Sequence, residues 1–166
     1  AVVPTLQELR RFRSDVVALL DGDQGGNDKR REISKMNDTQ KPKAIIQLGM
    51  EGEIEDLASW ILEPLFESPS PTLANLMVDV PEPWTVQGVG LRLKQRPYKE
   101  DWELHENLVW EAYNCNMCCL RAVAFLSDMA RICSGKKPTS PGWQLSTISG
   151  SNIPLHTATF IRNTIT

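Results

Sequence analysis

The side chains best suited to chemistry in this chain are four cysteines that share one apolar stretch, namely Cys115, Cys118, Cys119 and Cys133. If the stretch forms one helix, which turns by about 100° per residue, these thiols fall within roughly a third of its circumference. The same arc carries Leu104, Leu108, Ala122, Leu126 and Met129. Free cysteine is among the most buried residue types, so the pattern favours thiols packed in a core. The sequence therefore predicts reduced cysteines of low reactivity.

A metal site or a catalytic thiol is the alternative use of these cysteines. Cys115 and Cys118 have the spacing of a zinc-binding pair, and the chain also contains His105 and His156. In one continuous helix, however, Cys133 lies about 27 Å from Cys115 at ~1.5 Å per residue. Only a helix broken near Cys115 changes that geometry. Apolar surroundings in mid-helix also raise the pKa of a thiol. We therefore predict no catalytic residue, metal or cofactor, and a thiol- or zinc-dependent enzyme ranks third among the functions.

Basic side chains form the second group of residues that could carry a function. Arg92, Lys94 and Arg96 alternate along a predicted strand, which places them about 7 Å apart on one face at ~3.3 Å per residue. This spacing resembles that of successive phosphates on a nucleic-acid strand, which such groups bind. The candidate residues for binding single-stranded RNA are Arg92, Lys94, Arg96, Lys99, Lys29, Arg30 and Arg31. The alternative is that they form the solvated face of a half-exposed strand.

The composition describes an ordinary globular chain. Of its 166 residues, 41% are hydrophobic and 23% are charged, and the net charge is −3. This charge argues against indiscriminate coating of nucleic acid, although it permits a local basic patch. No apolar run reaches the roughly 18 residues that span a bilayer, so we expect no membrane insertion. Reduced cysteines predict an intracellular protein, with a virion as the alternative location.

Three main helices are expected to position these groups. The first covers about 5–21 and begins with a Thr5–Glu8 capping box, followed by a glycine-rich loop over 21–28. The second covers 51–66, with an apolar stripe at helical spacing and acidic residues in its first turn. The third covers 101–133. Its middle carries only Asn114, Asn116 and Arg121 as strongly polar residues, which predicts that most of its surface is covered, within the domain or by another subunit.

Two β elements complete the predicted fold. Residues 84–96 alternate like a strand with a bulge at Gly88. Residues 143–165 form either a β-hairpin or an extended arm that docks on a neighbouring subunit. The fold class is therefore α-rich α+β, with a helical domain over 1–137 and a C-terminal segment over 138–166.

These features favour a non-enzymatic structural protein that associates with itself. By analogy of architecture alone, such subunits include viral coat, matrix and nucleocapsid proteins. The expected interface residues are Trp143, Leu145, Phe160 and Ile161 in the C-terminal segment. The alternative function is a nucleic-acid-binding module that uses the basic strand face.

Overall fold

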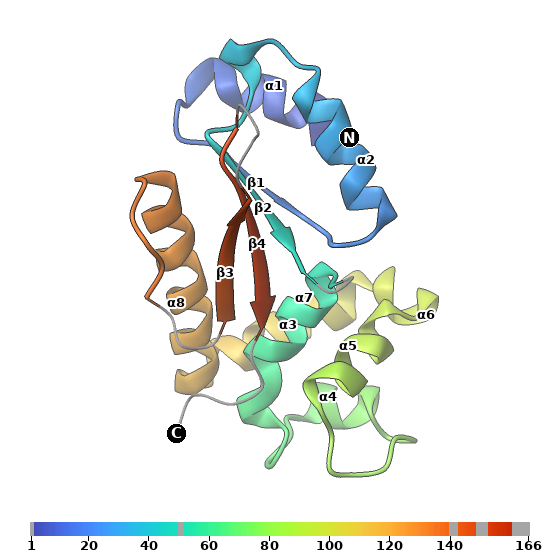
Figure 1. The fold of residues 1–166 in the computed structure, drawn as a ribbon. Coiled ribbons are helices and arrows are strands. Elements are labelled where there is room, and N and C mark those ends of the chain that lie inside the picture. The colour runs from blue at the N-terminus through green and yellow to red at the C-terminus, as the bar shows by residue number, and fades with distance from the viewer. Residues whose placement is uncertain (1, 50–51, 140–142, 149–152, 161–166) are drawn as a thin grey trace. The chain divides into compact units, whose positions relative to one another are not determined.

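The computed structural model describes residues 2–49, 52–139, 143–148 and 153–160 (Figure 1). The chain divides into a sheet unit, which comprises Ala1–Ile54 and Leu126–Thr166, and a helical unit, which comprises Glu55–Phe125. The described residues form eight α-helices, two short 3-10 helices and four strands. The predicted α-rich α+β class is confirmed, whereas the expected count of three main helices is wrong.

The sheet unit is built on four strands in the order β1-β2-β4-β3. β2 (Ala44–Leu48) is parallel both to β1 (Val17–Leu20) and to β4 (Leu155–Phe160). β3 (Trp143–Ile148) pairs antiparallel with β4. The helices of this unit are α1 (Val2–Phe12), α2 (Gln24–Ser34), the 3-10 helix η1 (Asp38–Gln40) and the part of α8 from Leu126 onward. All five residues of β2 are buried, as is typical of a central parallel strand.

Helices α1 and α2 close one core of the sheet unit. Leu6 of α1 and Ile33 of α2 pack with apolar residues of the strands and of the segment before β4, namely Ala18, Leu20, Ile45, Ile153 and Leu155. Asp23 caps α2, because its Oδ1 accepts a hydrogen bond from the Gly26 N–H at 2.7 Å. At Gly26 the helix approaches Asp21, the residue after β1, so closely that a Cβ atom would lie 1.9 Å from the Asp21 carbonyl oxygen. A helix with a glycine at this position therefore replaces most of the loop expected over 21–28.

The helix predicted over 5–21 is wrong in its second half. α1 ends at Phe12, and a turn follows in which Arg13 Nε lies 3.0 Å from Asp15 Oδ1. The next five residues, 16–20, are all apolar, and four of them form β1. A continuous apolar run of this length is typical of a parallel strand covered on both faces. Its residues also fit the helical spacing of the preceding segment, which is why periodicity alone extended the helix too far.

The helical unit consists of short helices around one apolar core. They are α3 (Ile54–Leu62), the 3-10 helix η2 (Glu63–Leu65), α4 (Pro71–Leu76), α5 (Val86–Lys94), α6 (Arg96–Lys99), α7 (Trp102–Tyr113) and the part of α8 (Asn116–Cys133) up to Phe125. The core contains Leu62, Leu73, Leu76, Met77, Val89, Leu93 and Leu108. α3 and η2 together occupy most of the helix predicted over 51–66.

The strand predicted over 84–96 is wrong, because these residues form the helix α5 and the start of α6. Thr85 is the N-cap of α5, and its Oγ1 accepts a hydrogen bond from the backbone N–H three residues later at 3.0 Å. Val89 and Leu93, one helical turn apart, are 0% and 1% exposed, whereas Leu91 between them is 55% exposed. The alternation that suggested a strand thus contains the i, i+4 pair of a helix.

The single helix predicted over 101–133 is also wrong, since the chain breaks between α7 and α8. Asn114 ends α7, and its Nδ2 donates a hydrogen bond back to the Trp110 carbonyl at 2.9 Å. The Cys115 carbonyl then accepts the first backbone hydrogen bond of α8, from the Cys119 N–H at 3.0 Å. Cys115 is therefore the N-cap of a new helix and not a mid-helix residue.

The C-terminal segment forms a hairpin that belongs to the main sheet. Trp143 is opposite Phe160, and the register continues to Ile148 opposite Leu155. β4 also pairs in parallel with β2 along residues 45–48. Of the two forms expected for residues 143–165, the hairpin is the one present within the described residues, and it packs in cis.

Candidate functional site at the junction of α7 and α8

The junction brings three of the four cysteines together at the start of α8. Cys115 is partly exposed, Cys118 is fully buried, and Cys119 lies one residue further along the helix. All three belong to the helical unit, and Cys133 belongs to the sheet unit. The cluster thus holds thiols that differ sharply in accessibility.

The helix that follows Cys115 changes the pKa of its thiol. Burial raises its pKa, but hydrogen bonds to its sulfur from the backbone N–H groups of Cys118 and Met117 and from the Cys118 thiol outweigh burial. The positive charge of Arg121 adds to this effect, so that the pKa of Cys115 lies below its ordinary value. The first N–H groups of a helix have no partner within it, which is why a thiolate at this position is stabilised.

The pKa of the Cys118 thiol is shifted in the opposite direction, and the Cys119 thiol is bonded to the end of α7. Burial, reinforced by the hydrogen bond that its thiol donates to Cys115, raises the pKa of Cys118 to about 12. Cys119 Sγ donates hydrogen bonds to the Tyr113 carbonyl at 3.2 Å and to the Ala112 carbonyl at 3.6 Å. These contacts join the first turn of α8 to the last turn of α7.

Cys133 stands apart from the cluster. Its Sγ lies 3.9 Å from the Asp15 carbonyl oxygen, and burial raises its pKa. The sequence predicted mid-helix thiols with raised pKa values. The direction of the pKa shift agrees with this prediction at Cys118 and Cys133, and the prediction is wrong at Cys115. The helix does break where a shared metal site would require it. Even so, the described residues contain no group of three or more His, Cys, Asp or Glu side chains able to hold an ion.

A second feature of the junction is the exposed apolar face of α7. Trp102 is 85% exposed, Val109 67%, Trp110 58% and Tyr113 68%. Trp102, Val109 and Tyr113 recur at i, i+7 and i+11, which places them on one side of the helix. The rings of Trp110 and Tyr113 meet edge to face, with centroids 5.9 Å apart. Leu120, in the second turn of α8, is 60% exposed.

The basic residues predicted to bind RNA do not form a ladder, because none of them lies on a strand. Arg92 Nε donates to the Leu76 carbonyl at 2.9 Å, and its guanidinium lies 4.6 Å from the centroid of the Tyr98 ring. Lys94 Nζ lies 2.8 Å from Asp56 Oδ2. These two cations are thus engaged inside the helical unit.

The remaining predicted RNA contacts are on helix surfaces. Lys99 pairs with Glu55 at 2.9 Å, and the exposed Arg96 pairs with Glu100 at 3.3 Å. Three basic residues of α2 also have partners. Lys29 forms an ion pair with Glu32, and Arg31 forms one with Asp28. Arg30 donates a hydrogen bond to the side chain of Gln47. Because these residues do not alternate along a strand, the argument from phosphate-like spacing does not support RNA binding. RNA binding stays a prediction.

The predicted interface residues lie on β3 and β4. Trp143 is 4% exposed and stacks on the Phe160 ring at a centroid distance of 6.2 Å. Leu145 and Phe160 are partly buried, and Ile161 lies outside the described residues. Among the described residues of this group, the large indole is thus already packed within its own chain.

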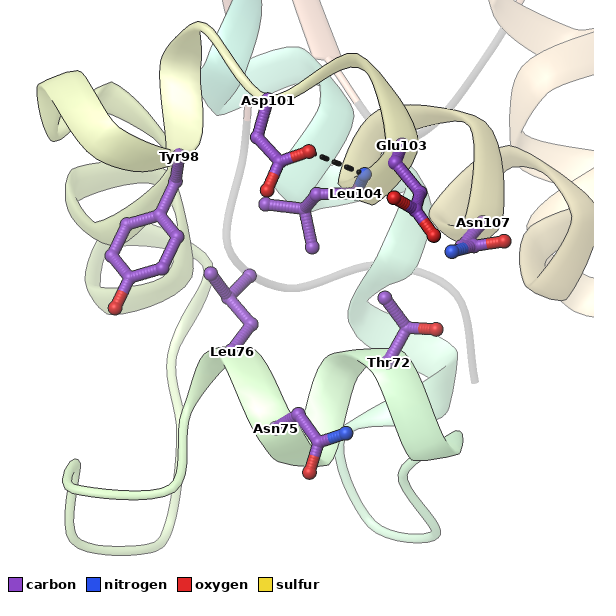
Figure 2. A pocket seen from close by; sticks show the side chains of 8 residues that line it. All are labelled: Thr72, Asn75, Leu76, Tyr98, Asp101, Glu103, Leu104 and Asn107. Carbon is purple, nitrogen blue, oxygen red and sulfur yellow. Dashed lines mark hydrogen bonds between the residues drawn. The ribbon is translucent and has the colours of Figure 1, made fainter.

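The helical unit also contains a shallow pocket of about 300 Å³ between α4, α6 and α7. Figure 2 shows Thr72, Glu103 and Asn107 gathered at one end and Tyr98 at the other. Asp101 points toward the start of α7, where its Oδ1 accepts a hydrogen bond from the Leu104 N–H at 3.0 Å. This carboxylate is the helix cap, and the lining contains no cysteine or histidine. The junction of α7 and α8 is therefore the stronger candidate.

Searches against protein-family models, curated proteins and solved structures found no match to this chain. Among the described helices, none is both long enough and apolar enough to cross a bilayer.

Sequence reasoning missed two properties of the junction for identifiable reasons. The N-cap role of Cys115 is signalled by the asparagines on both sides of it, because asparagine favours turns and helix ends. The exposed face of α7 is signalled by the i, i+7 and i+11 spacing of Trp102, Val109 and Tyr113. The sequence pattern alone does not distinguish this exposed stripe from the stripe that faces the core, because both stripes of the helix are apolar.

Proposed function

We propose that this protein is a structural or interaction protein that associates with itself through the exposed face of α7. The observation that carries the proposal is the exposure of Trp102, Val109, Trp110 and Tyr113, each by more than half, on one helix. Exposed apolar surface of this kind marks interaction sites. Tryptophan and tyrosine are also the residues that contribute most binding energy at protein interfaces.

The distribution of charge favours a second copy of the chain as the occupant. From Asn107 to Leu120 the only charged residue is Glu111. Its carboxylate faces inward, where Oε1 accepts a hydrogen bond from the Thr72 N–H at 3.0 Å and Oε2 accepts one from the Ser70 hydroxyl. The exposed C-terminal half of α7 is therefore uncharged. A two-fold axis opposes the same patch of both subunits, so the uncharged surface of Val109, Trp110 and Tyr113 meets its copy without like-charge repulsion. The exposed Glu106, one turn before Trp110, lies at the edge of this surface.

The aromatic side chains are also held in place before association. Trp110 and Tyr113 support each other through their edge-to-face contact, and Asn114 fixes the last turn of α7. Side chains that are already ordered lose less conformational entropy on binding. The face is thus suited to act as an anchor.

Light scattering coupled to size-exclusion chromatography tests the proposal. The wild-type chain should have a mass of at least two 18.7-kDa subunits, unchanged at high salt because the contact is apolar. The double variant Val109→Glu, Tyr113→Glu should be monomeric. The matched control Val78→Glu, Leu91→Glu changes side chains that are 80% and 55% exposed elsewhere in the helical unit, and it should behave like wild type.

Circular dichroism checks that each variant keeps its helical content. A monomeric wild type at the highest soluble concentration would refute the proposal. So would a double variant that keeps the wild-type mass, because the interface would then lie elsewhere. Capture of a different protein through the same residues would instead indicate that the occupant is not a second copy.

A further inference from the structure

A pocket of the sheet unit gathers positive charge and carries an inference independent of self-association. Its volume is about 520 Å³, which is in the range of small-molecule sites. Three basic side chains line it, namely Arg10 of α1, Lys41 after η1 and Lys43 before β2, together with the carboxylate of Asp38. Three positive charges and one negative charge leave a net charge of +2 on this lining. The chain as a whole has a net charge of −3, so the pocket is a local concentration of positive charge.

The charge of Arg10 is not balanced by a carboxylate. One terminal nitrogen, Nη1, donates a hydrogen bond to the Arg13 carbonyl at 3.0 Å. The Nε atom of Arg10 is buried and has no hydrogen-bond partner among the described residues, and Arg10 forms no ion pair within that part of the chain. Burial strengthens the attraction between opposite charges, so a partly buried guanidinium in this state favours an anion beside it.

The two lysines leave most of the positive charge available to a ligand. The Lys41 side chain is 14% exposed, and its Nζ lies 2.7 Å from Oδ1 of Asp38, whose side chain is 87% exposed. Lys43 is exposed and forms no ion pair with a described residue. Its charge acts on the carboxylate of Asp15, but Arg13 already binds that carboxylate through hydrogen bonds of 3.0 and 3.1 Å. Arg10 and Lys43 therefore both lack an ion-pair partner of their own.

Strand ends hold one side of the pocket in place. The Lys43 N–H donates a hydrogen bond to the Val16 carbonyl at 2.7 Å, and the Ile45 N–H donates one to the Pro154 carbonyl at 2.9 Å. The residues just before β1, β2 and β4 are thus joined at the edge where these parallel strands begin. A site on such connected elements needs little reordering when a ligand binds.

We propose that this pocket binds a phosphate monoester of a small organic molecule. The phosphate group of a monoester carries about −1.5 to −2 charges at pH 7, which matches the net charge of the lining. Arg10 and Lys43 pair with the phosphate oxygens, and the hydroxyl of Ser14, which also lines the pocket, donates a further hydrogen bond. The organic group contacts the apolar part of the lining, which consists of Pro42, Ile153 and Pro154.

Isothermal titration calorimetry of the full-length chain with phenyl phosphate tests the inference. We expect saturable binding at one site per subunit. Inorganic phosphate should bind more weakly because it lacks the organic group, and methyl phenyl phosphate should bind more weakly because it keeps the ring but carries a single charge. Absence of saturable binding of phenyl phosphate would overturn the inference. Equal or tighter binding of methyl phenyl phosphate would also overturn it, since the site would then suit the diester backbone of a nucleic acid.

Substitutions on α1 and before β2 locate the binding site. Arg10→Gln and Lys43→Gln should each weaken binding of phenyl phosphate by about 10-fold or more, because each removes a hydrogen bond between two charged groups. The matched control Arg11→Gln removes the same charge one residue along α1. Arg11 is 70% exposed in its side chain, pairs with Glu8 and does not line the pocket, so this variant should bind as wild type does. Equal weakening by Arg11→Gln would show a general effect of charge and would contradict a site in the pocket.

A measurement on the wild type does not depend on any variant folding. In nuclear magnetic resonance spectra, the backbone amide signals of Ser14, Lys41 and Lys43 should shift as phenyl phosphate is added and should saturate together with the calorimetric signal. Shifts confined to residues away from the pocket would refute the assignment of the site. Self-association is read from subunit mass without any ligand, so the two proposals can fail separately.

Discussion

The sharpest test of the helical unit is the substitution Glu111→Gln. Glu111 reaches from α7 to the start of α4, where it accepts hydrogen bonds from the Thr72 N–H and the Ser70 hydroxyl. Ser70 is the N-cap of α4, yet its own side chain makes no capping bond within that helix. The carboxylate of another helix therefore caps α4, and it joins two elements of the core.

The expected cost follows from these contacts. A hydrogen bond to a charged group contributes about 1.5–3 kcal/mol. Glutamine keeps an acceptor oxygen of similar position but loses the charge, so we expect a loss of about 1–2 kcal/mol in the free energy of unfolding. For a chain of this size that corresponds to a lower Tm by about 2–8 °C. Glu106→Gln changes an exposed glutamate on the same helix and should cost less than about 0.5 kcal/mol.

The same substitution predicts a dependence on pH. Burial raises the pKa of Glu111, but the hydrogen bonds from Ser70 and Thr72 outweigh burial, so the pKa lies below the ordinary value of 4.5. A carboxyl whose folded-state pKa is lowered stabilises the fold above its unfolded pKa, and that stabilisation is lost as the pH falls through the folded pKa. The stability difference between wild type and Glu111→Gln should thus be constant near neutral pH and should shrink below about pH 4.5.

Urea unfolding followed by circular dichroism and tryptophan fluorescence measures this difference at several pH values. The reasoning fails if Glu111→Gln is as stable as Glu106→Gln at pH 7. It also fails if the difference persists undiminished at pH 3, since the cost would then come from packing and not from the charge.

Two paired substitutions test the corrected elements by the same unfolding measurement. Leu93→Ala should cost about 2–5 kcal/mol because the side chain is buried in the core, whereas Leu91→Ala should cost less than about 1 kcal/mol because it is exposed; equal costs would favour a strand over α5. Gly26→Ala should cost about 1–3 kcal/mol through the clash with the Asp21 carbonyl. Gly25→Ala, where the nearest atom lies 3.3 Å away, should be neutral or stabilising by up to about 1 kcal/mol. A Gly26→Ala variant as stable as Gly25→Ala would contradict the close approach of α2 to the Asp21 backbone.

Local signals in the sequence were sufficient for part of the fold. The apolar stripe and acidic first turn of residues 51–66 predicted α3 and η2, because helix periodicity and the helix dipole act within a few residues. The segments 143–148 and 153–165, separated by turn-forming residues, predicted either a hairpin or an extended arm, and β3 and β4 form the antiparallel pair of the hairpin. Together they determined the α-rich α+β class.

Other segments fit two periods equally well, and packing decided between them. Val89 and Leu93 satisfy both the alternation of a strand and the i, i+4 spacing of a helix, and the exposed Leu91 shows which face the core of the helical unit selected. Similarly, the apolar residues of 16–20 continue the helical spacing of α1. They form β1 because pairing with β2 satisfies their backbone hydrogen bonds.

The chemistry of the candidate site was decided at the tertiary level. The sequence determined that three cysteines are close together, since they occupy five positions of the chain. It did not determine that Cys115 is an N-cap, because the same residues also fit a continuous helix. The chain instead ends α7 at Asn114 and packs Cys119 against the last carbonyls of that helix. That break turns free backbone N–H groups toward Cys115, and a thiol that a continuous helix would leave inert acquires a lowered pKa.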